Sequence, residues 1–306
     1  MDDHSAGRYR SLQDAVRAAF GPETRVLGRR SVSGGDINRA YQLSLSGGRT
    51  AFLKTNTMGN APFFTAEEHG LRALRSAGAI GVPSSLGAGV DTAGGYSFLL
   101  LEYLESGPRT ANYWETFGRR LARLHRASCA QLLPGADGRA AYGFPEDNFI
   151  GASRQKNTWH TSWVEFYRDC RLLPQVERAA DALGPALRQA LTRLLAHLDE
   201  ELREPPFPSL LHGDLWSGNV LCGPDGEAWI LDPAVYLGDF ETDLAMTELF
   251  GRFPAAFYGA YREVNPIEEG YARRRPLYQL YHLLNHLNLF GAGYLAGVAE
   301  IARRYA

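Results

Sequence analysis

One stretch of the chain, residues 212–219, reads His212-Gly213-Asp214-Leu215-Trp216-Ser217-Gly218-Asn219. Short apolar runs lie on both sides of it, and a further apolar run ends at Asp232. Pro- and Gly-containing turns separate these runs, which predicts short strands joined by loops. We expect Asp214 and Asn219 at the head of a hairpin and Asp232 at the exit of the next strand, so that three oxygen-bearing side chains converge.

This set of side chains matches what phosphoryl transfer asks of a protein. One carboxylate orients the attacking hydroxyl, and oxygen ligands hold magnesium on the nucleotide phosphates. The alternative is that an Asp and an Asn in a Gly-containing turn are ordinary turn residues. The length of the run and the second Asp favour catalysis. The sequence therefore predicts Asp214 as the catalytic base, Asn219 and Asp232 as ligands of Mg2+, and ATP as the phosphate donor.

The upstream sequence supplies the other parts of such a site in the order that kinases use. A Gly-rich turn lies between two strand-like stretches, residues 25–32 and 40–45, and its backbone amides can approach phosphate oxygens. A Gly-Gly turn alone is usually only a hairpin turn. The next strand-like stretch, residues 50–54, ends at Lys54, which we expect to hold the α- and β-phosphates. The expected nucleotide-binding residues of the turn are Ser33, Gly34, Gly35 and Asn38.

The helix that follows predicts different tasks for two adjacent glutamates. Thr65 and Glu68 have capping-box spacing, so we expect Thr65 to be the N-cap and Glu68 to lie on a charged face. Glu67 aligns with Leu71 and Leu74 and therefore projects from the apolar face. A carboxylate on that face requires a partner, and Lys54 is the expected one.

These motifs together resemble the fructosamine kinase (ketosamine 3-kinase) family, a branch of the aminoglycoside phosphotransferase-like kinases. The resemblance covers nearly the whole chain and is carried by residues 34–38, 52–54, 212–219, 232–236, 243–250 and 277–291. It implies a two-lobed, protein-kinase-like α+β fold: a small β-rich N-terminal lobe with one main helix and a larger, mostly helical C-terminal lobe. It also implies ATP-dependent phosphorylation of the sugar 3-hydroxyl of ketosamines, free or protein-bound, in a deglycation role.

The boundary between the lobes is expected where the apolar stretch 98–104 meets the breaker-rich residues 105–108. This gives an N-terminal lobe of residues 1–104 and a C-terminal lobe of residues 105–306. The resemblance implies that the backbone of Glu102, Tyr103 and Leu104 faces the adenine.

The resemblance places the acceptor side in an insert between the lobes and near the catalytic loop. Amides interleaved with aromatic rings suit a sugar with an amine-linked tail. Asp243, on a later helix, is expected to brace the catalytic loop rather than touch the substrate. The expected substrate-contacting residues are Trp216, Asn148, Gln155, Asn157 and Trp159.

Composition agrees with an enzyme of this kind. With 306 residues, 45% of them hydrophobic, the chain can bury a substantial core. A net charge of −2 favours neither a nucleic-acid nor a membrane partner. Three cysteines without CxxC spacing are typical of reduced, buried thiols, so we expect a cytoplasmic enzyme. We also expect a monomer, although no feature of the sequence determines the oligomeric state. His282 and His286 have the spacing of metal ligands but no Glu between them in the expected place, so we expect packed or partly exposed histidines.

Two alternatives stay open from the residues alone. The first is a kinase for another small alcohol, such as an aminoglycoside or a choline-like acceptor. The second is a catalytically silent nucleotide-binding protein, against which the complete set of Lys, Glu, Asp, Asn and Asp positions argues. The sequence does not distinguish which ketosamine sugar is preferred, nor a free amino acid from a protein lysine as the amine.

Overall fold

The computed structural model describes residues 9–32, 37–133 and 142–306. The chain forms two compact units: residues 1–111 together with 221–232, and residues 112–220 together with 233–306. The first unit is built on a sheet and the second is mainly helical, so the expected α+β class is confirmed. The lobe boundary expected between residues 104 and 105 stays a prediction.

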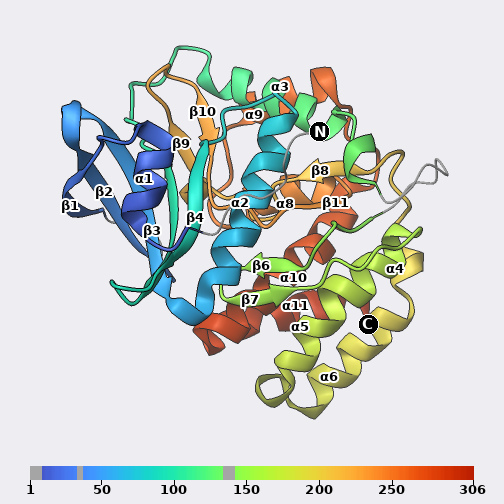
Figure 1. Ribbon diagram of the computed structural model, residues 1–306. Helices are drawn as coiled ribbons and strands as arrows, with labels where there is room; N and C mark the ends of the chain where they lie inside the picture. The colour runs from blue at the N-terminus through green and yellow to red at the C-terminus, as the bar shows by residue number, and fades with distance from the viewer. Residues whose placement is uncertain (1–8, 33–36, 134–141) are drawn as a thin grey trace. The chain divides into compact units, whose positions relative to one another are not determined.

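The first unit contains a five-stranded antiparallel sheet with the strand order β1-β2-β3-β5-β4 (Figure 1). One face packs on helix α1 (Leu12–Phe20) through fully buried side chains such as Val16, Leu43 and Leu53. Side chains alternate along a strand, so Lys54 points to the opposite face from Leu53. The strands are β1 (Val26–Val32), β2 (Arg39–Leu45), β3 (Thr50–Thr57), β4 (Ser85–Asp91) and β5 (Tyr96–Glu102).

Helix α2 (Ala61–Ser76) begins a full turn earlier than the sequence indicated. Its N-cap is Asn60, and Pro62 occupies the first turn, where a missing N–H costs nothing. Thr65 therefore lies inside the helix, and its hydroxyl donates to the Ala61 carbonyl oxygen at 3.4 Å. The expected capping box is wrong, because the proline sets the start of the helix.

The environment of Glu68 also differs from the expectation of a charged surface. Its side chain is buried, and Oε1 accepts hydrogen bonds from Arg72 at 2.7 Å and from the Ser85 hydroxyl at 2.9 Å. Ser85 begins β4, so Glu68 joins α2 to the sheet. Glu68 is an internal hydrogen-bonding residue of the first unit.

The chain returns to the first unit near strand β9 (Val220–Cys222), which pairs with β10 (Ala228–Ile230). The Ile230 N–H donates to the Gly81 carbonyl oxygen at 2.9 Å, and the ring of Trp229 lies against Gly81. A Cβ at Gly81 would come within 2.6 Å of that ring, so the close approach requires glycine. This docking fixes the short segment that ends at Asp232.

The second unit is mainly helical and carries two short antiparallel ladders, β6–β7 and β8–β11. Its helices are α3 (Tyr113–Arg126), α4 (Trp163–Tyr167), α5 (Leu173–Arg178), α6 (Ala180–Ala196), α7 (Leu198–Glu201), α8 (Glu241–Leu249), α9 (Ala255–Val264), α10 (Tyr271–Phe290) and α11 (Leu295–Tyr305). Its strands are β6 (Asn148–Ile150), β7 (Ser153–Gln155), β8 (Ser209–Leu211) and β11 (Tyr236–Gly238).

The strands on either side of the 212–219 run do not pair with each other, so the expected hairpin is wrong. β8 pairs with β11, whereas β9 pairs with β10. All residues of β8 and β11 are buried, while those of β9 are half-buried. A fully buried strand has its backbone groups satisfied by an equally buried partner. The catalytic run is therefore a loop between two separate ladders.

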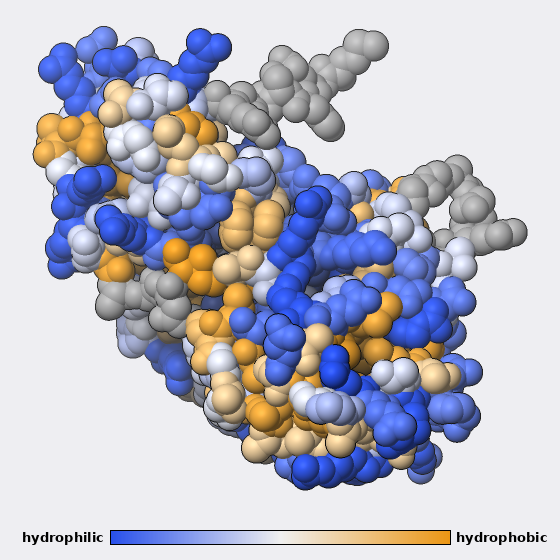
Figure 2. All heavy atoms as spheres, turned by 90° about the horizontal axis from the view of Figure 1, so that it is seen from below, coloured by the Kyte–Doolittle hydropathy of each residue, from blue (hydrophilic) through white to orange (hydrophobic). Residues whose placement is uncertain are grey.

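Large apolar side chains are mostly inside. The exposed ones among the described residues are Leu27, Ile37, Met58, Leu173, Trp216 and Phe290. On the face shown in Figure 2, apolar groups are interspersed with hydrophilic ones. No helix of the described ranges is long and apolar enough to cross a membrane.

Helices α3 and α9 cross closely at Gly118. A Cβ at that position would lie 2.2 Å from the backbone oxygen of Phe257, and backbone cannot move aside as a flexible side chain can. We predict that Gly118→Ala lowers the free energy of unfolding by about 1–3 kcal/mol, as overpacking of a tight contact does. Urea denaturation measures the change.

Gly259, on an exposed position of α9, is the matched control. A Cβ there meets nothing within 4 Å. We expect Gly259→Ala to stabilise by about 0.5–1 kcal/mol, because alanine loses less backbone entropy in a helix. Equal effects of the two substitutions would contradict the close crossing at Gly118.

Candidate active site

A buried lysine held by two carboxylates forms the centre of the first unit. Lys54 Nζ donates to Glu67 Oε1 at 2.6 Å and also to Asp232 Oδ1. Burial by itself would lower the pKa of Lys54, but the charges of Asp232 and Glu67 raise it above its ordinary value. Lys54 is therefore cationic at neutral pH. The expected pairing of Glu67 with Lys54 is confirmed.

Asp232 has a backbone conformation that few residues adopt. Its φ is 55°, the only positive value among the described non-glycine residues. Strain of this kind persists where the surroundings fix the residue, and it is frequent at functional sites. Unlike Lys54 and Glu67, the Asp232 side chain is 45% exposed. Its carboxylate can therefore face a ligand while it pairs with Lys54.

The catalytic run in the second unit brings Asp214 and Asn219 together. Asn219 Nδ2 donates to the Asp214 carbonyl oxygen at 2.9 Å and to Oδ2 at 3.2 Å. The Asn219 N–H closes the turn onto the Trp216 carbonyl oxygen at 3.0 Å. Because both hydrogen bonds use the amide nitrogen of Asn219, its side-chain oxygen is directed elsewhere.

Asp243 at the start of α8 holds the beginning of the run. Its Oδ2 accepts from the His212 N–H at 2.7 Å, and its Oδ1 accepts from the Gly213 N–H at 2.9 Å. His125 Nε2 lies 3.2 Å from the same carboxylate. Burial opposes ionisation, yet the interactions with His125 and His212 keep the pKa of Asp243 below its ordinary value. The expected bracing role of Asp243 is confirmed.

The backbone conformation and close surroundings of residue 213 require glycine. Its φ is 82°, and a Cβ would lie 2.0 Å from the Ala234 carbonyl oxygen. The Ala234 N–H in turn donates to the His212 carbonyl oxygen at 2.8 Å. The start of the catalytic run is thus packed against the residues that follow Asp232 in the chain.

Three amides that the sequence assigned to the substrate form an internal network instead. Asn148, Gln155 and Asn157 are buried, with exposed fractions of 4%, 2% and 1%. Asn148 Nδ2 donates to the Val235 carbonyl oxygen at 2.7 Å, and Gln155 Nε2 donates to Asn148 Oδ1 and to the Ala234 carbonyl oxygen. These amides support the backbone after Asp232.

The rest of the network leaves these amides little freedom. Gln155 Oε1 accepts from the Tyr281 hydroxyl at 2.7 Å, and Asn157 Nδ2 donates to Asn148 Oδ1 and the Glu146 carbonyl oxygen. A sugar hydroxyl could bind these groups only by breaking buried hydrogen bonds, which is costly. Direct contact of Asn148, Gln155 and Asn157 with the substrate would require these hydrogen bonds to break, and it stays a prediction.

Arg171 lies at the end of this network, and no sequence motif predicted its role. Arg171 is fully buried in a π-helical turn, and its NH2 group donates to Asn157 Oδ1 at 2.8 Å. The guanidinium lies 3.9 Å from the ring centroid of Tyr236. Aromatic faces and neutral oxygens thus replace a carboxylate as its partners.

The two tryptophans expected at the substrate differ in exposure. Trp216 is 37% exposed, and its ring lies over Gly218, where a Cβ would come within 2.3 Å. The edge of the ring meets Phe250 with a centroid distance of 6.3 Å. Trp159 is half-buried and packs on Gly143. Trp216 therefore presents an aromatic face two residues from Asp214, as expected.

The nucleotide-binding residues expected from the sequence are described in part. Ser33, Gly34 and Gly35 lie outside the described residues. Asn38 Oδ1 accepts from Asn56 Nδ2 at 2.7 Å, which ties the end of the turn to β3.

At the expected adenine side, β5 ends at Glu102. The Glu102 N–H donates to the Ser84 carbonyl oxygen at 3.0 Å, and its side chain accepts from the Ser84 N–H at 2.7 Å. Tyr103 and Leu104 follow the last paired residue of the ladder. Their backbone groups therefore lie beyond the hydrogen bonding of the sheet.

His282 is a second residue whose position the sequence did not predict. It was expected to be packed or partly exposed, and it is indeed buried in α10, but its Nδ1 lies 3.9 Å from Asp214 Oδ1. Among the described residues this Nδ1 atom has no hydrogen-bond partner. Burial, with smaller contributions from His286 and Arg171, lowers the pKa of His282 to about 3.

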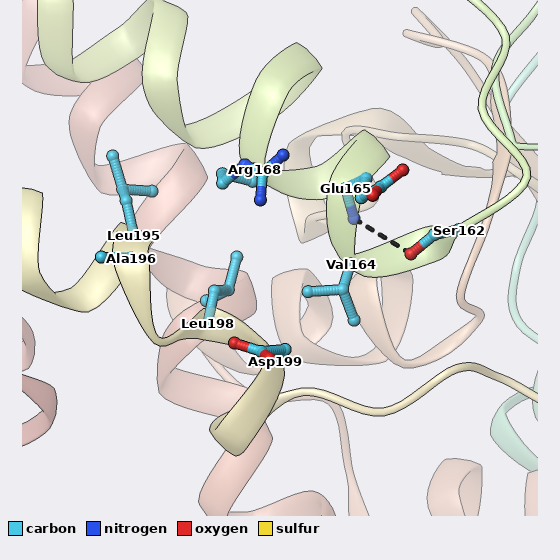
Figure 3. Close-up of a pocket in the computed structure, with 8 residues that line it drawn as sticks. All are labelled: Ser162, Val164, Glu165, Arg168, Leu195, Ala196, Leu198 and Asp199. Atoms are coloured by element: carbon cyan, nitrogen blue, oxygen red, sulfur yellow. Dashed lines mark hydrogen bonds between the residues drawn. The ribbon is translucent and has the colours of Figure 1, made fainter.

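A cavity of about 280 Å³ lies elsewhere in the second unit (Figure 3). Its lining residues are Ser162, Val164, Glu165, Arg168, Leu195, Ala196, Leu198 and Asp199. None of them belongs to the catalytic run or to the amide network. Within the described ranges, no group of three or more His, Cys, Asp or Glu side chains could hold a metal ion.

A buried lysine paired with a helix glutamate in one unit, together with an Asp–Asn loop in the other, is typical of the class of kinase-like phosphotransferases. The fold agrees: a macrolide 2′-phosphotransferase aligns over 96% of this chain and 95% of its own, with a TM-score of 0.60 and 16% identity. The model of the fructosamine kinase family matches residues 9–305. The chain belongs to the fructosamine kinase family.

Relatives support this membership along the whole chain. A protein of Synechocystis named "probable ketoamine kinase" is 42% identical, covering 96% of this chain and 95% of the relative. A chloroplastic protein-ribulosamine 3-kinase of Arabidopsis thaliana is 39% identical, covering 93% of this chain and 84% of its own. The structure of a candidate fructosamine-3-kinase of Haemophilus somnus has a TM-score of 0.84 and 29% identity, covering 98% of both chains.

The buried neutral imidazole of His282 predicts a specific loss of stability in acid. In the unfolded chain a histidine has a pKa of about 6.5. Below that pH the imidazole binds a proton in the unfolded state but not in the folded state. Stability therefore falls as pH decreases from about 6.5 towards 3, by roughly 2 kcal/mol at pH 5. We predict that His282→Asn removes most of this loss, measured by urea denaturation at pH 7 and pH 5.

His197→Asn is the control, because the His197 side chain is 67% exposed. An equal reduction of the pH dependence by both substitutions would contradict the assignment to His282.

Proposed function

We propose that the protein transfers the γ-phosphoryl group of ATP to the 3-hydroxyl of ketosamines. The observation that carries the proposal is Lys54, held at once by Glu67 and Asp232. A lysine fixed in this way serves the α- and β-phosphates of a nucleotide. The acceptor class is supported by relatives named ketoamine kinase and protein-ribulosamine 3-kinase.

In the proposed mechanism Asp214 accepts a hydrogen bond from the attacking hydroxyl and takes its proton. The transition state of phosphoryl transfer is loose, so alignment matters more than a strong base. Asn219 and Asp243 fix the two ends of the catalytic run, which holds Asp214 in one orientation. Lys54 neutralises charge on the α- and β-phosphates.

Mg2+ fits the oxygen groups that the site offers. The side-chain oxygen of Asn219 is left over when its nitrogen binds Asp214, and the Asp232 carboxylate is half exposed. Both are the hard oxygen ligands that this ion prefers. When bound, it would offset negative charge on the ATP phosphates. We propose that Asn219 and Asp232 hold it.

We propose that Ser33, Gly34, Gly35 and Asn38 cover the phosphates. The backbone of Glu102, Tyr103 and Leu104 would face the adenine. On the acceptor side, we propose that Trp216 provides a face for the cationic amine and the apolar edge of the sugar. We propose Trp159 as a further substrate-contacting residue. Phosphorylation would start removal of the sugar, a deglycation role. The cytoplasmic location and the monomeric state stay predictions.

The proposal is tested by ADP release with a panel of ketosamines, an aminoglycoside and choline. We expect turnover with the ketosamines. Activity towards only the aminoglycoside or choline would assign the enzyme to another acceptor, which the shared fold allows. No turnover with any acceptor would favour a silent nucleotide-binding protein.

Substitution of Asp214 and of Asp232 should affect catalysis and nucleotide binding differently. We predict that Asp214→Asn lowers kcat by about 10²–10⁴-fold while nucleotide binding is kept, because only the hydroxyl loses its partner. Asp232→Asn should also weaken binding of Mg-ATP, because it removes a charged ligand. Steady-state kinetics and nucleotide titration measure both, and near-parental turnover of Asp214→Asn would refute its role as base.

Substitution of Glu67 should mainly lower activity, whereas substitution of Glu68 should mainly lower stability. Glu67→Ala releases Lys54 and should lower kcat/KM by about 10²-fold, as misplaced catalytic groups do. Glu68→Ala removes the partner of Arg72 and Ser85 and should cost about 1–3 kcal/mol of stability, with activity kept in the folded fraction. The reverse order of activities would show that Glu68, not Glu67, serves the phosphate-binding lysine.

A further inference from the structure

His282 presents an unused polar atom to the proposed catalytic base. The side chain is 3% exposed, and its Nδ1 has no partner among the residues that the structure describes. Unpaired buried polar atoms are rare and costly, and such an atom in a native site commonly serves a ligand. The atom it faces is Asp214 Oδ1, at 3.9 Å.

The ring is neutral, and its tautomer follows from its neighbour. A lone pair on Nδ1 would face a carboxylate oxygen and be repelled, so Nδ1 carries the hydrogen and can donate. The lowered pKa of His282 agrees with a neutral ring. At 3.9 Å the N–H is too far from Asp214 for a direct hydrogen bond. A ligand that lies alongside both groups can offer one oxygen atom to each of them.

The two groups have opposite requirements. Asp214, when ionised, only accepts, so it needs a hydroxyl that donates; His282 Nδ1 only donates, so it needs an oxygen that accepts. A hydroxyl with a carbonyl on the next carbon supplies this pair. A ketosamine has that arrangement at its 3-hydroxyl and its C2 carbonyl.

We propose that His282 is a specificity-determining residue that donates a hydrogen bond from Nδ1 to the substrate carbonyl oxygen beside the hydroxyl bound by Asp214. The inference rests on the proposed function. Two fixed contacts on adjacent carbons orient the hydroxyl, which a single contact with Asp214 leaves free to rotate. No covalent bond forms or breaks at His282.

The test compares two substrates and two variants in a cycle. One substrate is a ketosamine, and the other is its analogue with a methylene group at C2, which lacks the oxygen. His282→Leu removes the donor, whereas His282→Asn keeps one, because the Asn amide nitrogen occupies nearly the place of Nδ1. The readouts are kcat and KM for acceptor and for ATP.

We expect the parent to prefer the ketosamine. His282→Leu should lower kcat/KM for the ketosamine by about 10–100-fold, as loss of one buried hydrogen bond does, with KM for ATP little changed. The methylene analogue should lose little in the same variant. His282→Asn should restore most of the preference. A purely structural role would affect both substrates equally.

Three outcomes would overturn the inference. They are equal losses for both substrates in His282→Leu, an unchanged preference in that variant, and no preference in the parent. If His282→Leu does not fold, His282→Met provides a donor-free side chain of similar length. A parent without turnover on any ketosamine would reject the proposed function itself. Parental turnover with an insensitive His282→Leu variant would reject only the role of His282.

Discussion

The buried ammonium of Lys54 is the interaction on which the first unit depends. A charge taken out of water is costly unless it is paired, and Lys54 has two carboxylates, one from α2 and one at the end of the 221–232 segment. Removal of either partner leaves a charge poorly compensated. The lysine therefore connects β3, a helix and a segment that lies far away in the sequence, and it sets their relative placement within this unit.

In the second unit a buried carboxylate also holds distant segments together, but it binds backbone N–H groups rather than a charged side chain. Asp243 accepts the N–H groups of His212 and Gly213 with separate oxygens, so the start of the catalytic run cannot rotate. The amides Asn148 and Gln155 hold the strand-like segment against which Gly213 packs. Fully satisfied networks of this kind make a loop rigid. The start of the loop that carries Asp214 is therefore held by buried hydrogen bonds from other parts of the second unit.

The contrast between internally bonded groups and groups without a partner affects substrate specificity. The amides expected at the substrate are hydrogen-bonded within the second unit. We therefore propose that recognition depends on groups without such internal hydrogen bonds. Trp216 offers an exposed ring, and His282 offers a buried donor without a partner. A buried donor rejects an acceptor that lacks the matching oxygen more strongly than an apolar pocket rejects an extra group. In this interpretation, one histidine gives the site its preference for a ketone.

The sequence by itself determined the class of the protein. The 212–219 run, the alternation of residues 50–54 and the phase of Glu67 on its helix predicted the proposed catalytic set, because each is a local pattern of spacing or periodicity. The start of α2 was predicted wrongly, because the propensity of Pro62 for the first helical turn outweighed the capping box.

Only the tertiary structure decided which strands pair, which amides are buried and which histidine lies beside Asp214. The pairing of β8 with β11 and the contact of His282 with Asp214 join residues that are far apart in the chain. Such contacts depend on which surfaces are buried together. A single sequence shows which residues are present, but it does not show which distant residues come into contact.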